Sequence, residues 1–152
     1  MTTVSDLLRE KGNVVWATRP DATVFEALEL MAEKNIGAVL VLDENKLVGV
    51  MSERDYARKV ILMGKSSRET AVCEIMTERV VCVRPSQTVA ECMALMTEKR
   101  IRHLPVLDTG DRVIGIVSIG DVVKAVIAQQ EFTITNLEQY ITGARVSSYP
   151  VF

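Results

Sequence analysis

The sequence has few of the residues that build metal sites or fibrous chains. Its 152 residues include one histidine, three cysteines, four prolines and eight glycines. One histidine and three cysteines without a CxxC pair leave little for a zinc site, so we expect no bound metal. So few prolines and glycines exclude a collagen-like or low-complexity chain. The net charge of −2 gives no electrostatic reason to bind nucleic acid, and we expect no such partner.

Long apolar runs are also missing. No stretch approaches the ~20 residues that cross a membrane, and the start, MTTVSDLLREKG, lacks the layout of a secretory signal. We therefore expect a cytoplasmic protein with no membrane partner and with buried, reduced thiols. Hydrophobic residues at 48% and charged residues at 25% are typical of a well-packed globular protein. The length suits one domain, or two half-domains that share a core.

The chain contains two copies of one pattern. The segment GVMSERD at 49–55 recurs as GIVSIGD at 115–121. Several dipeptides of the first copy return in the same order in the second: Arg19-Pro20, Thr23-Val24 and Glu33-Lys34 match Arg84-Pro85, Thr88-Val89 and Glu98-Lys99. A register kept over this length indicates an internal duplication. Because one half has too little cover for its own sheet, we expect the halves to pack together about a pseudo-two-fold axis.

Hydrophobic spacing predicts the same elements in both halves. For the first half these are a helix at 4–10, a strand at 14–17, a helix at 23–34, strands at 38–42 and 47–51, and a helix at 53–63. The segment 72–76 mirrors the opening helix. We divide the chain into a first repeat at 1–64, a linker at 65–71, a second repeat at 72–130, and a C-terminal helix and tail at 131–152.

The segment after the second repeat predicts one more amphipathic helix. Ile134, Leu137, Tyr140 and Ile141 recur at helical spacing, and Gly143 ends the pattern. The apolar face of this helix either packs against the core of its own chain or forms an oligomer contact, and the sequence does not separate the two. The last nine residues are expected to be loosely ordered.

Both copies end a strand with the motif Ser-x-x-Asp. Ser52 and Asp55 in the first copy, and Ser118 and Asp121 in the second, lie where a strand gives way to a helix. A helix N-terminus attracts a phosphate, and a carboxylate suits the two hydroxyls of a ribose. The alternative is that these residues are ordinary helix caps. One copy would favour the caps, whereas two copies in the same surroundings favour a ligand site.

With the duplication, these motifs and the stretch IRHLPVLD at 101–108, residues 1–130 resemble a tandem pair of CBS domains. The resemblance implies an α/β (α+β) fold of two pseudo-symmetric β-α-β-β-α repeats packed sheet to sheet, plus the C-terminal helix. It implies a regulatory module that binds adenine-containing ligands, such as AMP, ADP, ATP, NAD or S-adenosylmethionine, and that often forms a homodimer. The chain would be a stand-alone member, whose downstream partner the sequence does not reveal.

The resemblance places one cleft, the Asp121 cleft, beside the second motif. Ser118 would hold a phosphate and Asp121 a ribose, near the backbone of Ile116. His103 would face the same cleft as a phosphate contact, although a lone histidine is as often structural. The adenine would lie against the first repeat, at Asn13, Val14, Val15, Ile36, Gly37 and Ala38.

The other cleft, the Asp55 cleft, would use Ser52 and Asp55. Ala38 stands at the position that matches His103, so the phosphate needs another cation. Arg54 and Arg58 are the candidates, because guanidinium groups grip phosphate bidentately. Gly120 replaces Arg54 in the second motif, so we expect two unequal sites. The adenine of this cleft would lie against Val80, Val81, Ile101 and Arg102.

Two other functions compete with a nucleotide sensor. One is a constitutive dimerisation or scaffold module with vestigial clefts. The other is an enzyme, which we do not expect because the sequence has no Ser-His-Asp order, no acid pair with a metal site and no Walker loop. Trp16 is expected either to stack on a base or to lie in the core. The methionines at 31, 93 and 96 are expected to fill the core.

Overall fold

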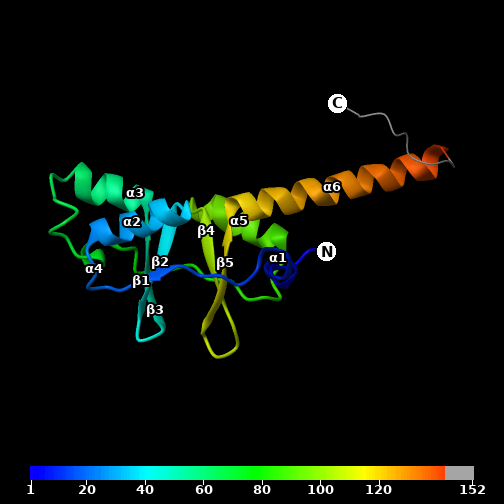
Figure 1. Ribbon diagram of the computed structural model, residues 1–152. Helices are drawn as coiled ribbons and strands as arrows, with labels where there is room; N and C mark the ends of the chain where they lie inside the picture. The colour runs from blue at the N-terminus through cyan, green and yellow to red at the C-terminus, as the bar shows by residue number, and fades with distance from the viewer. Residues whose placement is uncertain (143–152) are drawn as a thin grey trace.

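The computed structural model describes the backbone of residues 1–142 and the side chains of residues 1–139, which form two halves lying side by side (Figure 1). Each half carries a β-hairpin, and the two hairpin loops project in the same direction. The first half contains β1 (Ala17–Thr18), α2 (Val24–Lys34), β2 (Ala38–Asp43), β3 (Lys46–Ser52), α3 (Glu53–Tyr56) and the π-helical turn η1 (Ala57–Ile61). The second contains α5 (Val89–Lys99), β4 (His103–Leu107), β5 (Val113–Ser118) and α6 (Ile119–Thr142). Short leading helices, α1 (Val4–Lys11) and α4 (Val72–Ile75), precede the halves.

The sheets follow one plan. In the first half β1 pairs parallel with β2, and β2 pairs antiparallel with β3. In the second half β4 pairs antiparallel with β5, and a single parallel bridge between Val83 and Val106 stands in for the first strand. The fold is therefore the expected pair of β-α-β-β-α repeats packed sheet to sheet. The first strand is shorter than expected, because Asn13 and Val14 are exposed before β1 begins.

Equivalent residues begin and end the helices. Thr23 accepts a hydrogen bond from the Glu26 N–H at the start of α2, and Thr88 from the Glu91 N–H at the start of α5, both at 3.1 Å. Such caps satisfy backbone donors that the first turn leaves unpaired. Asn35 ends α2 and Arg100 ends α5, each in the left-handed region with φ of 53° and 55°.

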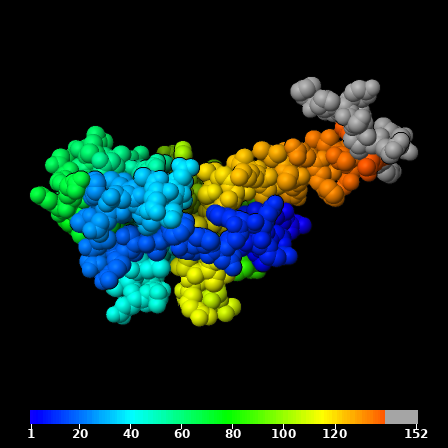
Figure 2. Space-filling view, viewed as in Figure 1, coloured from blue at the N-terminus to red at the C-terminus, as the bar shows by residue number. Residues whose placement is uncertain are grey.

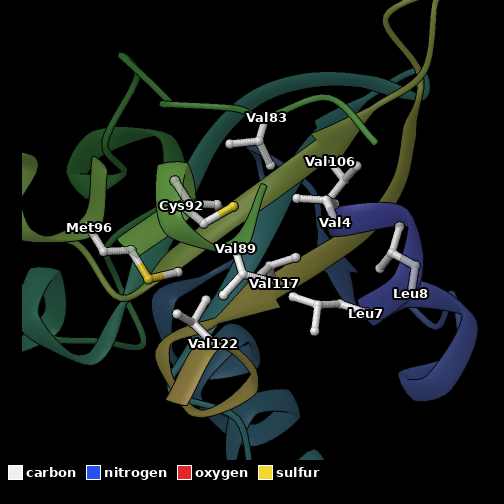
Figure 3. Packing of buried hydrophobic residues seen from close by; sticks show 11 residues of the cluster. Val4, Leu7, Leu8, Val83, Val89, Cys92, Met96, Val106, Val117 and Val122 are labelled. Atoms are coloured by element: carbon white, nitrogen blue, oxygen red, sulfur yellow. The ribbon is translucent and has the colours of Figure 1, made fainter. Parts of the chain in front are cut away.

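Each leading helix packs in the hydrophobic core of the half that it does not precede. Val4, Leu7 and Leu8 of α1 pack in the core of the second half, as Figure 3 shows. Val72 and Ile75 of α4 pack in the core of the first half. Each half is thus completed by a helix that precedes the other half in the chain.

Two glycines allow this packing. A Cβ atom at Gly115 in β5 would lie 2.6 Å from Leu8 Cδ2, and one at Gly49 in β3 would lie 2.6 Å from Met76 Sδ. Real Cβ atoms do not approach other heavy atoms so closely, so a side chain at either position would have to displace the end of the Leu8 or the Met76 side chain. The glycine that opens each repeated motif is therefore explained by packing.

The C-terminal part differs from the expectation. The helix expected after residue 130 is not separate, because α6 runs unbroken for 24 residues from Ile119. Its distal half extends beyond the body of the molecule, in orange in Figure 2. Ile134 and Leu137 are 55% and 54% exposed, so they do not pack on the core of their own chain. The side chains of Tyr140 and Ile141, and Gly143 with the last nine residues, lie outside the described part.

Several expected core residues are at the surface. Cys92 is buried as expected, whereas Cys82 is half-buried and Cys73 is exposed. Met31 and Met96 are buried, but Met93 is 40% exposed. Trp16 is also 40% exposed and carries the Lys34 ammonium 4.2 Å from its ring centre, so it is not a core residue. Among residues 1–142, no helix has the length and apolar character that spanning a bilayer requires.

Candidate functional site

A cleft of about 460 Å³ lies between the two repeats, within the ~300–1,000 Å³ typical of small-molecule sites. One wall is the junction of β3 with α3, and the other is formed by residues that follow α4 and α5. All but one of the side chains assigned to the Asp55 cleft line it: Ser52, Arg54, Asp55, Val80, Val81, Ile101 and Arg102. Arg58 does not, because it lies one turn further along the helix.

Residues assigned to the Asp121 cleft are divided. Gly37, Ala38 and His103 were expected in the Asp121 cleft, but they line the Asp55 cleft. The others do not line it: Asn13, Val14, Val15, Ile36, Ile116, Ser118 and Asp121. Sequence reasoning also missed five residues that line the cleft: Val50, Glu53, Thr77, Arg79 and Arg100.

The Asp55 cleft is rich in guanidinium groups. Arg54, Arg79, Arg100 and Arg102 line it, against the two carboxylates of Glu53 and Asp55. The Arg54 side chain reaches across to the other repeat, where its Nη1 donates to the Arg100 carbonyl at 3.0 Å. Four arginines around one small cleft suit an anionic ligand, because each can grip a phosphate.

Asp55 is fixed by four donors. Its Oδ2 accepts from the Ser52 N–H at 2.9 Å and from the Ser52 hydroxyl at 3.1 Å. Its Oδ1 accepts from the Thr77 hydroxyl at 3.2 Å and lies 3.0 Å from Lys59 Nζ. The Ser52 hydroxyl in turn accepts from the Asp55 N–H, so the two residues form a capping box. A carboxylate has about four acceptor sites, so a ribose hydroxyl has to replace one of these donors.

At the place expected for the Asp121 cleft, a lysine contacts the second Ser-x-x-Asp motif. Asp121 Oδ2 accepts from the Ser118 N–H at 2.8 Å and from Lys11 Nζ at 2.6 Å. Lys11 also donates to the Ile116 carbonyl at 2.7 Å. Ser118 and Asp121, expected at the phosphate and the ribose, do lie together near the Ile116 backbone, but Lys11, the last residue of α1, lies among them. It reaches this place because α1 packs on the second half.

This lysine changes the charge balance of the cleft. Burial raises the pKa of Asp121, but hydrogen bonds from Lys11 and the Ser118 N–H, with the Lys11 charge, outweigh it and leave the pKa below its ordinary value. Burial, and then the Lys11 charge, lower the pKa of His103, and the Asp121 charge opposes them. Smaller effects come from Arg102, which lowers this pKa, and from Glu53, which raises it.

We predict that Lys11→Met raises the pKa of His103, because it removes a nearby positive charge and leaves the charge of Asp121 without its ion-pair partner. The chain has one histidine, so a proton NMR titration of its ring follows this residue alone. The folded state of the native protein favours neutral His103, so this residue's contribution to stability is complete above pH ~6.5 and is lost as the pH falls toward the folded pKa. Lys46→Met, on the exposed hairpin, is the control. An unchanged pKa in Lys11→Met would contradict the observed geometry.

Comparison with known proteins identifies the family. The model of the CBS domain matches residues 4–61 and again residues 72–128. The chain belongs to the CBS domain family. The resemblance seen in the sequence is confirmed, and CBS-domain pairs are regulatory modules.

Relatives and solved structures agree with this assignment. The chain is 42% identical to the CBS domain-containing protein CBSX3, mitochondrial, of Arabidopsis thaliana, over 93% of this chain and 73% of that protein. It is 53% identical to a putative signal-transduction protein with CBS domains from Burkholderia ambifaria, with a TM-score of 0.81 over 85% of this chain and 96% of that one. The CBS domain pair of protein MJ0100, solved in complex with 5′-methylthioadenosine and S-adenosyl-L-methionine, is 27% identical, with a TM-score of 0.73 over 82% and 99% of the two chains.

Proposed function

We propose that this CBS pair is a regulatory module, not an enzyme, that binds an adenine nucleotide in the Asp55 cleft. The observation that carries the proposal is the composition of that cleft, which joins a Ser-x-x-Asp motif and apolar residues from two repeats with four arginines. The related pair of protein MJ0100 binds two adenosine-containing ligands, which supports the same class of ligand here.

The parts of the cleft fit the parts of a nucleotide. Val80, Val81 and Ile101 form an apolar wall for the base, and the arginines surround the place for phosphate. Asp55 and Ser52 offer the sugar a carboxylate and a hydroxyl that already share a hydrogen bond. S-adenosylmethionine carries a positive sulfonium and no phosphate, so four guanidinium groups disfavour it electrostatically. AMP, ADP, ATP and NAD are therefore the preferred candidates.

The proposal includes only one open cleft per chain. The Lys11 ammonium contacts both Asp121 and the Ile116 carbonyl, where a ribose would have to bind in the Asp121 cleft. A ligand there has to displace a charge-assisted pair, worth roughly 1.5–3 kcal/mol. The two sites are thus proposed to be unequal, as the sequence predicts, but the residue responsible is Lys11.

The wider setting is also part of the proposal. We place the protein in the cytoplasm as a homodimer, without a bound metal and without a nucleic acid or membrane partner. Among the described residues, no group of three histidine, cysteine or acidic side chains is arranged to hold a metal ion. The relative CBSX3 is named as mitochondrial, so subcellular fractionation of the source organism is the test of location.

Nucleotide binding should raise the melting temperature. At a hundred times its dissociation constant a ligand adds about 2.7 kcal/mol to folding stability, or about 5–10 °C for a chain of this size. We expect this rise with a phosphate-bearing nucleotide and a smaller one with S-adenosylmethionine. Arg102→Ala should weaken nucleotide affinity roughly 10- to 100-fold, because it removes a charged contact. Differential scanning fluorimetry and calorimetry measure both effects.

Arg19→Ala is the matched control, because Arg19 pairs on the surface with Asp21 and lies outside the cleft. Flat melting curves for all five ligands would favour the alternative, a constitutive scaffold. The ion pair across the Asp121 cleft is the observation that favours that alternative, since a closed cleft needs no ligand.

A further inference from the structure

Among the described residues, the distal half of α6 contributes no side chain to either hydrophobic core. Among the described residues, none after Val126 belongs to or packs against the second core. From Ile127 to Gln139 no side chain is buried, and Figure 2 shows this part extending past the body. Most helices in proteins owe their stability to packing of an apolar face. This helix therefore has an apolar face that the described residues, 1–139, leave exposed.

The exposed residues have the spacing of a coiled coil. Val123, Ile127, Gln130, Ile134 and Leu137 are separated by alternating steps of four and three residues. The four apolar members are 46%, 50%, 55% and 54% exposed, and Gln130 is exposed too. Alternating steps of three and four place residues on one stripe that a second helix of the same kind can cover. We call these five residues the seam.

The seam is distinct from the face that packs on the body. That face uses Val122, Ala125 and Val126, which belong to or pack against the second core. A hollow of about 510 Å³ adjoins the seam, and its lining includes Met1, Met93 and Ile134. Met1 and Met93 are 94% and 40% exposed. The uncovered apolar surface thus continues from the seam onto α5 and the N-terminus.

We propose that α6 pairs with α6 of a second copy of this chain as a parallel, two-stranded coiled coil. Ile127 and Ile134 take the a positions and Leu137 a d position, a combination that favours two parallel strands. Parallel pairing sets Gln130 against its own counterpart, where two amides can hydrogen-bond and fix the register. Antiparallel pairing would set Gln130 against an isoleucine. Glu131 is the only charged residue between 125 and 137, so few like charges oppose the contact.

Charges placed on the seam should separate the copies. We expect Ile134→Glu with Leu137→Glu to raise the dissociation constant of the dimer at least roughly 100-fold, because four carboxylates would be buried without partners. The same variant should lose helix content by circular dichroism. Phe132→Glu is the matched control, because Phe132 is 68% exposed but lies off the seam. Sedimentation of the full chain, without added nucleotide, measures the constant independently of the Asp55 cleft.

A cysteine at position 137 tests the direction of pairing. In the parallel pair Leu137→Cys faces its own counterpart and should form a disulfide under mild oxidation. In the antiparallel pair that sets Gln130 against Ile134, Leu137 faces Ile127, so the two cysteines would be about 15 Å apart, because ten residues of helix rise that far. Phe132→Cys and the native chain control for the three native cysteines. Equal masses for both glutamate variants, or equal cross-linking of Leu137→Cys and Phe132→Cys, would overturn the proposal.

Discussion

Asp55→Ala should lower the free energy of unfolding by about 3 kcal/mol. The Asp55 side chain is only 10% exposed, and its loss leaves the Ser52 N–H and the Thr77 hydroxyl without this acceptor. It also removes the ion pair with Lys59, whose ammonium keeps the Ile75 carbonyl. Leaving buried donors unpaired is more harmful than the mean value of a hydrogen bond suggests. The melting temperature should fall by about 6–12 °C. Urea unfolding measures the change in free energy.

Two comparisons make this test specific. Asp55→Asn keeps an oxygen that can accept from the Ser52 N–H, so it should lose about half as much stability. Glu53→Ala changes an exposed acid in the same helical turn and should shift stability by less than about 0.5 kcal/mol. Equal stability of Asp55→Ala and Glu53→Ala would show that the four contacts are not made in solution. Because Asp55 supports the fold, Arg102→Ala is the cleaner test of nucleotide binding.

Lys11→Met should open the Asp121 cleft. The wild-type chain is expected to bind one nucleotide, and the variant two, with affinity at the second cleft raised roughly 10- to 100-fold. That factor corresponds to the charge-assisted contacts that a ligand no longer has to break. Methionine keeps much of the length of the lysine side chain without its charge. Isothermal titration calorimetry gives the number of sites directly.

Lys46→Met controls for the loss of a positive charge, because Lys46 lies on the exposed hairpin. It should leave one site of unchanged affinity. Two sites in the wild-type chain, both weakened in Lys11→Met, would show instead that Lys11 binds the ligand. An unchanged single site in Lys11→Met would show that this cleft stays closed for another reason.

The sequence predicted what depends on local pattern and on repetition. The helices that begin at Thr23 and Thr88, both hairpins and the pairing of the two halves follow from spacing that the chain shows twice. The capping alternative for Ser52 and Asp55 also describes their geometry, while their role toward a ligand stays a prediction. Arg79 and Arg100 were missed as cleft residues. Arg79 directly precedes Val80 and Val81, and Arg100 directly precedes Ile101, all of which were expected to lie against the adenine.

What the sequence did not predict depends on contacts between distant segments. Lys11 was missed because its place beside Asp121 requires α1 to leave its own half, which no local pattern reveals. The continuous α6 was missed because the second repeat ends near residue 130, and the helix was expected to end with it. No glycine or proline interrupts residues 121–142, so nothing in the sequence stops the helix there. The π-helical turn after α3 likewise has no recognised sequence signal.

The crossing of the leading helices also bears on how the molecule arose. A polypeptide made of one repeat would begin with a helix that fits the core of a neighbour and not its own. Such a polypeptide could complete its core only as a dimer in which two identical molecules swap their leading helices. Fusion of two gene copies would then join partners that already depended on each other. The present chain is accordingly expected to unfold in one step, because neither half keeps its hydrophobic interior when the other is lost.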